Sequence, residues 1–142
     1  MEFHQILVPV VGTEADKEAI RLACRLGKQN KKSRIWAVYV ITIKRTLPLD
    51  AEIEPETKRA EGILEQMEIV AEEVDCEIDT DILQAREAGL AIVDEAVERG
   101  INLILMGVTY GTRFGQFSLG NVVPYVLKNA PCRVILYHQP TA

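Results

Sequence analysis

Residues 106–122, MGVTYGTRFGQFSLGNV, contain four glycines between an apolar run and a segment with helical periodicity. Glycine adopts positive φ angles and lets a ligand approach the backbone closely. A helix that begins after Gly120 would present N–H groups and the positive end of its dipole to an anion. These features indicate a candidate phosphate-binding loop, in which Arg113 could add a charge-assisted hydrogen bond. The alternative is structural, because glycines such as Gly107 and Gly120 routinely end strands and start helices.

Few other side chains suit catalysis or metal binding. The sequence contains two histidines, His4 and His138, and three cysteines, Cys24, Cys76 and Cys132. They offer no zinc-site spacing and no catalytic triad, and no residue stands out as a general base. We therefore expect no enzyme and no metal site, with a slow nucleotide hydrolase as the alternative. Each cysteine lies beside apolar residues and far from the others, so we expect reduced, buried thiols in a cytoplasmic protein.

The composition is that of one globular domain over residues 1–142. The chain is 48% hydrophobic and has a formal net charge of −5. A domain of this size buries enough surface to fold without a metal or a disulfide. The negative charge argues against nucleic acid or an anionic membrane as a partner. The apolar runs are too short to cross a bilayer, and the N-terminus runs directly into a strand, so we expect neither membrane insertion nor a secretory signal.

Strand and helix signals alternate along the chain. Apolar and β-branched runs predict five strands, at residues 6–11, 34–43, 77–85, 102–107 and 132–138. Helical spacing predicts four helices, which begin after Thr13, at Pro55, near Glu87 and after Gly120. Thr13 also resembles the first residue of a capping box with Asp16, although Glu would fit that third position better. This alternation indicates an α/β fold with a parallel sheet covered by helices on both faces.

The helical spacing also predicts which residues face the core. From the last three helices these are Ile63, Met67, Val70, Ala71, Val74, Ala88, Ile92, Ala96, Val122, Val123, Val126, Leu127 and Ala130. In such sheets a ligand binds outside the carboxyl ends of the strands, where the strand order reverses. The loops after the first and fourth strands are therefore expected to line a crevice.

Three common motifs do not fit these loops. No G-x-G-x-x-G opens a helix, so a dinucleotide-binding fingerprint is absent. Residues 27–28 read GK but lack the upstream glycine and the Ser or Thr of a P-loop. A response-regulator receiver would need acidic residues where Val10, Val11 and Gln84 stand.

Four segments, ILVPVVGTEADKEAIRLACRLGK, WAVYVI, AIVDEAVERGINLILMG and LGNVVPYVLKNAPCRVIL, resemble the universal stress protein family in order and spacing. The resemblance covers nearly the whole chain, and YVLKNAPCRVIL is its most specific part. It implies an open five-stranded parallel sheet of order 3-2-1-4-5, similar to the adenine nucleotide alpha hydrolases. It also implies homodimers and, in one subgroup, ATP bound in the crevice.

The ATP-binding subgroup carries G-x-x-G, nine residues, and then G followed by Ser or Thr, together with an Asp after the first strand. Gly107 and Gly120 match two of the glycines, but Tyr110 replaces the second glycine. Val11 replaces the Asp and cannot accept a ribose hydroxyl or hold a metal. Asn121 replaces Ser or Thr, yet it can still cap the helix and donate from its amide. We expect weak or absent ATP binding.

The resemblance implies a nucleotide site, for which the cofactor is uncertain and ATP or AMP is the candidate. The residues that it assigns to this site are Pro9, Val10, Val11, Val40, Met106, Gly107, Arg113, Gly120, Asn121 and Val122. No catalytic and no metal-binding residue is expected among them.

A narrower similarity concerns partners. RTLPLDAE and ILQAREAGLAIVDEA resemble the stress-protein-like cytosolic domains of some amino-acid permeases. The leading interpretation is a non-catalytic, dimeric regulatory module that binds a small ligand, and the alternative is a sensor domain that regulates a membrane transporter. Residues 134–137 of the last strand carry no charge, and the resemblance places that strand at the sheet edge. We therefore expect a homodimer formed through this strand.

Overall fold

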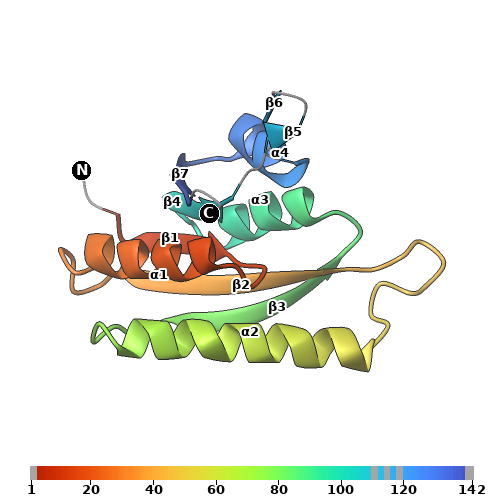
Figure 1. Cartoon of the computed structure of the whole chain (residues 1–142), viewed down its shortest axis with the longest axis horizontal. Coiled ribbons are helices and arrows are strands. Elements are labelled where there is room, and N and C mark those ends of the chain that lie inside the picture. The colour runs from red at the N-terminus through yellow and green to blue at the C-terminus, as the bar shows by residue number, and fades with distance from the viewer. Residues whose placement is uncertain (1–2, 110–111, 114–115, 118–119, 140–142) are drawn as a thin grey trace.

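The computed structural model of the chain describes residues 3–109, 112–113, 116–117 and 120–139, and for residues 112–113 and 116–117 it describes the backbone (Figure 1). The elements are β1 (Gln5–Pro9), α1 (Glu14–Gly27), β2 (Arg34–Thr42), α2 (Glu54–Glu72), β3 (Asp79–Ala85), α3 (Ala88–Glu98), β4 (Leu103–Val108), β5 (Thr112–Arg113), β6 (Gln116–Phe117), α4 (Val122–Asn129) and β7 (Arg133–His138). Each predicted strand and helix is present, and the largest shift of a strand boundary is two residues.

Five strands form one parallel sheet in the order β3-β2-β1-β4-β7. The central strand β1 pairs with β2, where Ile6 lies opposite Ile35, and with β4, where Ile6 lies opposite Leu103. This confirms the expected order 3-2-1-4-5, with β7 as the fifth strand of the sheet. The strand order reverses between β1 and β4, which is the predicted place for a ligand crevice.

Helices cover both faces of the sheet (Figure 1). On one face α1 and α2 pack on residues such as Ile6 and Val8 of β1, and on the other α3 and α4 pack on residues such as Leu7. The alternation of side chains along β1 explains its unbroken apolar sequence, because both faces are buried. Trp36 and Tyr39 of β2 are 6% and 9% exposed and pack within the core.

The core faces of the helices largely follow the predicted spacing, with one correction. Val123 and Val126 of α4 are buried, but Leu127 is 51% exposed. Helix α4 has only eight residues, and a position that follows Val126 by one lies about 100° around the helix, on its solvent flank. The glycine segment also contains structure that the sequence did not predict, because β5 and β6 pair as a short antiparallel hairpin.

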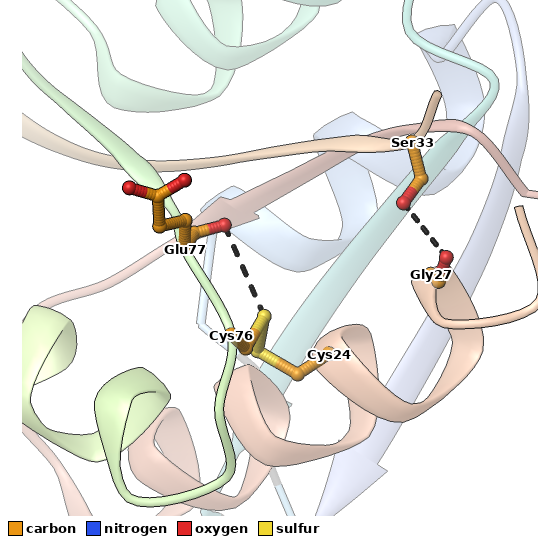
Figure 2. The surroundings of a disulfide bond; sticks show 5 residues. All are labelled: Cys24, Gly27, Ser33, Cys76 and Glu77. Atoms are coloured by element: carbon orange, nitrogen blue, oxygen red, sulfur yellow. Dashed lines mark hydrogen bonds between the residues drawn. A yellow bond between two sulfur atoms is a disulfide. The ribbon is translucent and has the colours of Figure 1, made fainter. Parts of the chain in front are cut away.

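The cysteines are not all reduced, so that expectation is wrong. Cys24 of α1 forms a disulfide with Cys76, which lies in the turn after α2, and their Cα atoms are 6.0 Å apart (Figure 2). The two residues are 52 positions apart in sequence, but α1 and α2 pack side by side on the same face of the sheet. Cys132, partly buried beside β7, is the free thiol of the described residues.

None of the helices in the described part of the chain combines the length and apolarity that crossing a membrane requires.

Candidate functional site

The carboxyl ends of β1, β2 and β4 lie side by side at the same end of the sheet because the three strands are parallel. Pro9 ends β1, and the N–H of Val10 donates to the Val38 carbonyl at 2.9 Å. Val11 follows at the surface with 63% of its area exposed. Val40 lies half-buried near the end of β2.

The fourth strand and the last helix supply the other predicted residues. Met106 is buried and Gly107 half-buried near the end of β4, whereas Asn121 and Val122 lie at the start of α4. Gly120 precedes them with a φ of +73°, a conformation that favours glycine. The backbone of Arg113 lies in β5, and its side chain is outside the described part of the structure. Tyr110 also lies outside the described residues.

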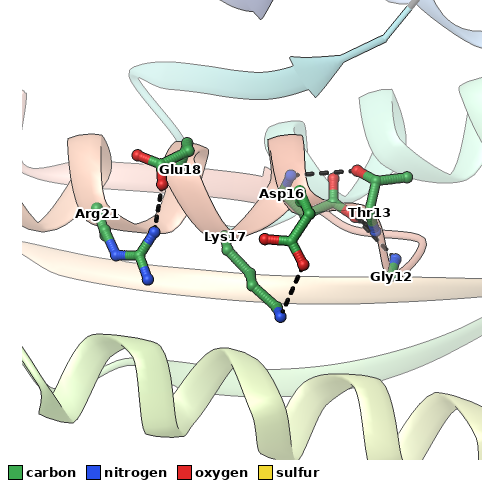
Figure 3. Close-up of polar contacts among 7 residues, drawn as sticks. Gly12, Thr13, Asp16, Lys17, Glu18 and Arg21 are labelled. Carbon is green, nitrogen blue, oxygen red and sulfur yellow. Dashed lines mark hydrogen bonds and ion pairs between the residues drawn. The ribbon is translucent and has the colours of Figure 1, made fainter. Parts of the chain in front are cut away.

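Asp16 holds the loop after β1, a role that the sequence did not reveal. Its Oδ2 atom accepts hydrogen bonds from the N–H groups of Val11, Gly12 and Thr13 at 2.8, 2.7 and 2.9 Å. Figure 3 shows Asp16 beside Gly12 and Thr13. Thr13 Oγ1 accepts the Asp16 N–H at 3.2 Å, which confirms the predicted capping box. Gly12 has a φ of +108°, and this backbone conformation turns consecutive N–H groups toward one point.

Three consecutive N–H groups around one oxygen are an arrangement that protein loops use to bind phosphate. Here a carboxylate of the same chain occupies that position, and Asp16 is only 1% exposed. The loop after β1 therefore has its N–H groups paired internally. The sequence gives one weak indication of this role for Asp16, because an Asp stands at the capping-box position that the longer Glu fits best.

Gly107 is explained by packing. A Cβ atom at this position would lie 2.9 Å from the Asp16 nitrogen and closer still to the carbonyl group of Ala15. Gly107 does not adopt a positive φ angle, so the close approach of α1 to β4 alone requires glycine here. This supports the structural alternative for the first glycine of the motif.

The start of α4 borders an open cavity of about 490 Å³ at the ends of α3 and α4. Its lining residues are Thr42, Glu87, Ala88, Gly89, Leu90, Asn121, Val122 and Tyr125. Neither Glu87 nor Asn121, the residues that precede the two helices, makes a capping hydrogen bond with its side chain. The N-termini of α3 and α4 therefore both border this cavity, and neither is capped by the side chain of its N-cap residue.

Close packing holds the two helices in this arrangement. A Cβ atom at Gly89 would lie 2.9 Å from the ring of Tyr125, so glycine at this position lets α3 approach α4. Of the ten residues predicted from sequence, Asn121 and Val122 line the cavity. The cavity carries one acidic side chain, Glu87, which is exposed at its rim.

A parallel α/β sheet with a crevice where the strand order reverses defines a ligand-binding class of fold. The sequence matches the Universal stress protein family over residues 2–138. A universal stress protein of Methanocaldococcus jannaschii is 30% identical over an aligned length of 144 residues, and the alignment covers 97% of this chain and 84% of that protein. The chain belongs to the universal stress protein family.

Solved structures of low sequence identity share the fold. The universal stress protein of Archaeoglobus fulgidus in complex with dAMP has a TM-score of 0.73 at 19% identity and covers 96% of this chain and 98% of that one. An Arabidopsis thaliana family member with AMP bound has a TM-score of 0.65 at 16% identity, covering 96% and 92%. A universal stress protein of Lactobacillus plantarum has a TM-score of 0.68 at 23% identity, covering 96% and 99%.

Proposed function

We propose that this protein is a non-catalytic regulatory module that binds an adenine nucleotide with low affinity and favours a single phosphate group. One observation carries the proposal: Asp16 already occupies the three N–H groups of the loop after β1. The N-terminus of α4, beside the cavity, then remains as the anion-binding element of the crevice. The dAMP and AMP complexes of other family members are consistent with a nucleoside monophosphate as the ligand.

The charge of Asp16 explains why further phosphates should not help. A triphosphate whose first phosphate lies at α4 would extend additional negative charge into a crevice that already holds a buried carboxylate. Like charges in a partly buried site repel more strongly than in water, because screening is weaker there. We therefore expect AMP to bind at least as tightly as ATP.

The test compares two asparagines at opposite ends of α4. Asn121→Asp adds a negative charge at the proposed phosphate site and should weaken AMP binding up to about tenfold, as helix-terminus charge effects allow. Asn129→Asp adds the same charge at the last residue of the helix and should leave the affinity unchanged. Isothermal titration calorimetry with AMP and ATP measures both effects.

The variants Asn121→Asp and Asn129→Asp distinguish a loss of affinity from a loss of stability. An aspartate before the first turn of a helix stabilises it, so Asn121→Asp should lose affinity without losing stability. Tight ATP binding by the unmodified protein, or an unchanged AMP affinity in Asn121→Asp, would contradict the proposal. Restoring the family residues with Val11→Asp and Tyr110→Gly should raise the affinity for ATP. We expect no phosphate release when the protein is incubated with ATP.

We also propose that the protein is a homodimer formed through β7. The two edges of the sheet differ in their protection. On β3, the carboxylate of Asp81 accepts the N–H of Ile82 at 2.9 Å, and Asp79 pairs with Arg34 at 3.0 Å. On β7, residues 134–137 are uncharged and only partly buried. An unprotected edge favours pairing with a second copy across a two-fold axis.

A role as the cytoplasmic sensor of an amino-acid transporter is a second candidate, supported by the loop over residues 44–53. Gln84 donates to the carbonyls of Leu49 and Ala51 at 2.9 and 2.8 Å, and Arg86 donates to that of Lys44. The loop is thus held in place while Leu49 stays 49% exposed, available to a partner. A permease gene beside this one, and transport by that permease that changes when the protein is added, would support this candidate.

A further inference from the structure

The disulfide between Cys24 and Cys76, which Figure 2 shows, borders a surface cavity of about 230 Å³. Both cysteines line this cavity, together with Lys28, Lys31, Asp75 and Glu77 and with residues of the 27–35 connection. Cys24 is 1% exposed and belongs to the core, whereas Cys76 is partly exposed in the turn after α2. The cavity therefore gives small molecules access to the bond from the side of Cys76.

Hydrogen bonds independent of the disulfide hold both cysteines in position. The N–H of Cys76 donates to the Ala71 carbonyl at 3.0 Å, and that of Asp75 donates to Glu72 at 3.0 Å. The Cys24 carbonyl accepts the N–H of Lys28 at 3.1 Å at the end of α1. Because these bonds do not involve sulfur, the two thiols would stay close together after the disulfide is broken.

We propose that Cys24–Cys76 is a reversible thiol–disulfide exchange site that reacts with a small zwitterionic thiol through Cys76. The lining of the cavity carries both charge signs, in Lys28 and Lys31 and in Asp75 and Glu77, which suits a thiol that carries both signs itself. Such a site makes the covalent link between α1 and the α2–β3 turn dependent on the redox state of its surroundings. It is independent of the proposed nucleotide site, because Cys24 lies about 12 Å along α1 from Asp16.

The chemistry proceeds in two exchange steps. A thiolate attacks the sulfur of the partly exposed Cys76, the Cys24–Cys76 bond breaks, and the Cys24 sulfur leaves as a thiolate that takes a proton from water. A second thiolate then attacks the sulfur of the bound small thiol and releases Cys76. Two small thiols are oxidised to one disulfide, and the protein gains two electrons and two protons. An oxidised small-molecule disulfide reverses both steps.

The third cysteine serves as an internal reference. Cys132 lies on the other face of the sheet, and burial raises the pKa of its thiol. Little of it is therefore ionised at neutral pH, and it should not react under the conditions that open the disulfide.

The test treats the folded protein with glutathione at neutral pH, traps all thiols by alkylation at low pH, and locates the products by peptide mass spectrometry. In the unmodified protein we expect a disulfide that glutathione reduces and oxidised glutathione restores, with unchanged circular dichroism. Two matched variants identify the attacked sulfur. Oxidised glutathione should form an adduct on Cys76 in Cys24→Ala, whereas Cys24 in Cys76→Ala should react only after denaturation.

Three results would overturn the proposal. One is a protein that never forms the Cys24–Cys76 bond in oxidised glutathione. Another is a bond that glutathione reduces only once the protein is unfolded, which would make it a permanent link. The third is an adduct on Cys24 in folded Cys76→Ala that forms as fast as the adduct on Cys76 in Cys24→Ala. Each is measured on the unmodified protein or on a variant whose fold is checked by circular dichroism.

Discussion

Replacing Gly107 by alanine tests whether this glycine serves packing or ligand binding. The added methyl group would meet the backbone of Ala15 and Asp16 at less than 3.0 Å. Backbone atoms cannot rotate away as a side chain can, so α1 must shift on the sheet. Overpacking of this kind costs about 1–3 kcal/mol, and we expect a loss near the upper end of that range. Urea denaturation followed by circular dichroism measures it.

Gly62 provides the matched control. It lies inside α2, and a Cβ atom there would meet nothing within 4 Å. Gly62→Ala should therefore raise the free energy of unfolding by about 0.5–1 kcal/mol, because alanine is the better helix former. The same chemical change thus has opposite signs at the two positions. If Gly107→Ala folds with unchanged stability but loses nucleotide affinity, the glycine is a ligand contact and the packing argument is wrong.

Two further predictions concern the crevice and the sheet edge. Asp16→Asn should lower the free energy of unfolding by about 1–2 kcal/mol, because it weakens the hydrogen bonds from three N–H groups, and should raise the affinity for ATP relative to AMP. The control Glu18→Gln, which removes a surface ion pair with Arg21, should change stability by less than about 1 kcal/mol; equal effects of the two variants would refute the role of Asp16. Ile135→Lys in β7 should give a monomer or an insoluble protein, whereas Leu127→Lys on the exposed flank of α4 should not. A monomeric unmodified protein in light scattering at high concentration would exclude dimerisation through β7.

The fold could be predicted from the sequence because a strand buried on both faces of the sheet has an unbroken run of apolar residues. The continuous apolar runs at residues 6–11 and 103–106 supply most of the adjacent central strands β1 and β4. The end of α1 at Gly27 and the start of α2 near Pro55 also followed local rules. The expected inward position of Leu127 was wrong because this residue follows the buried Val126 by one position and lies on the solvent flank of α4.

The site was less predictable, because its chemistry depends on contacts distant in space. Nothing in the sequence near Cys24 indicates Cys76, since the two approach only when α1 and α2 pack together. The carboxylate of Asp16 was interpreted as a helix cap alone, although the turn at Gly12 also directs loop N–H groups to it. The hairpin within the glycine segment pairs residues with no strong strand signal.

The disulfide also shapes the chain when it is not folded. It closes a covalent ring between residues 24 and 76, and this ring contains the whole of β2 and α2. An unfolded chain with such a ring has fewer conformations, which by the chain-entropy model favours the native state by about 4 kcal/mol for a loop of 52 residues. A denatured chain would therefore keep the turn after α2 tethered to α1, with β2 and α2 inside the closed ring, and this tether shortens the search for the contacts among them on refolding.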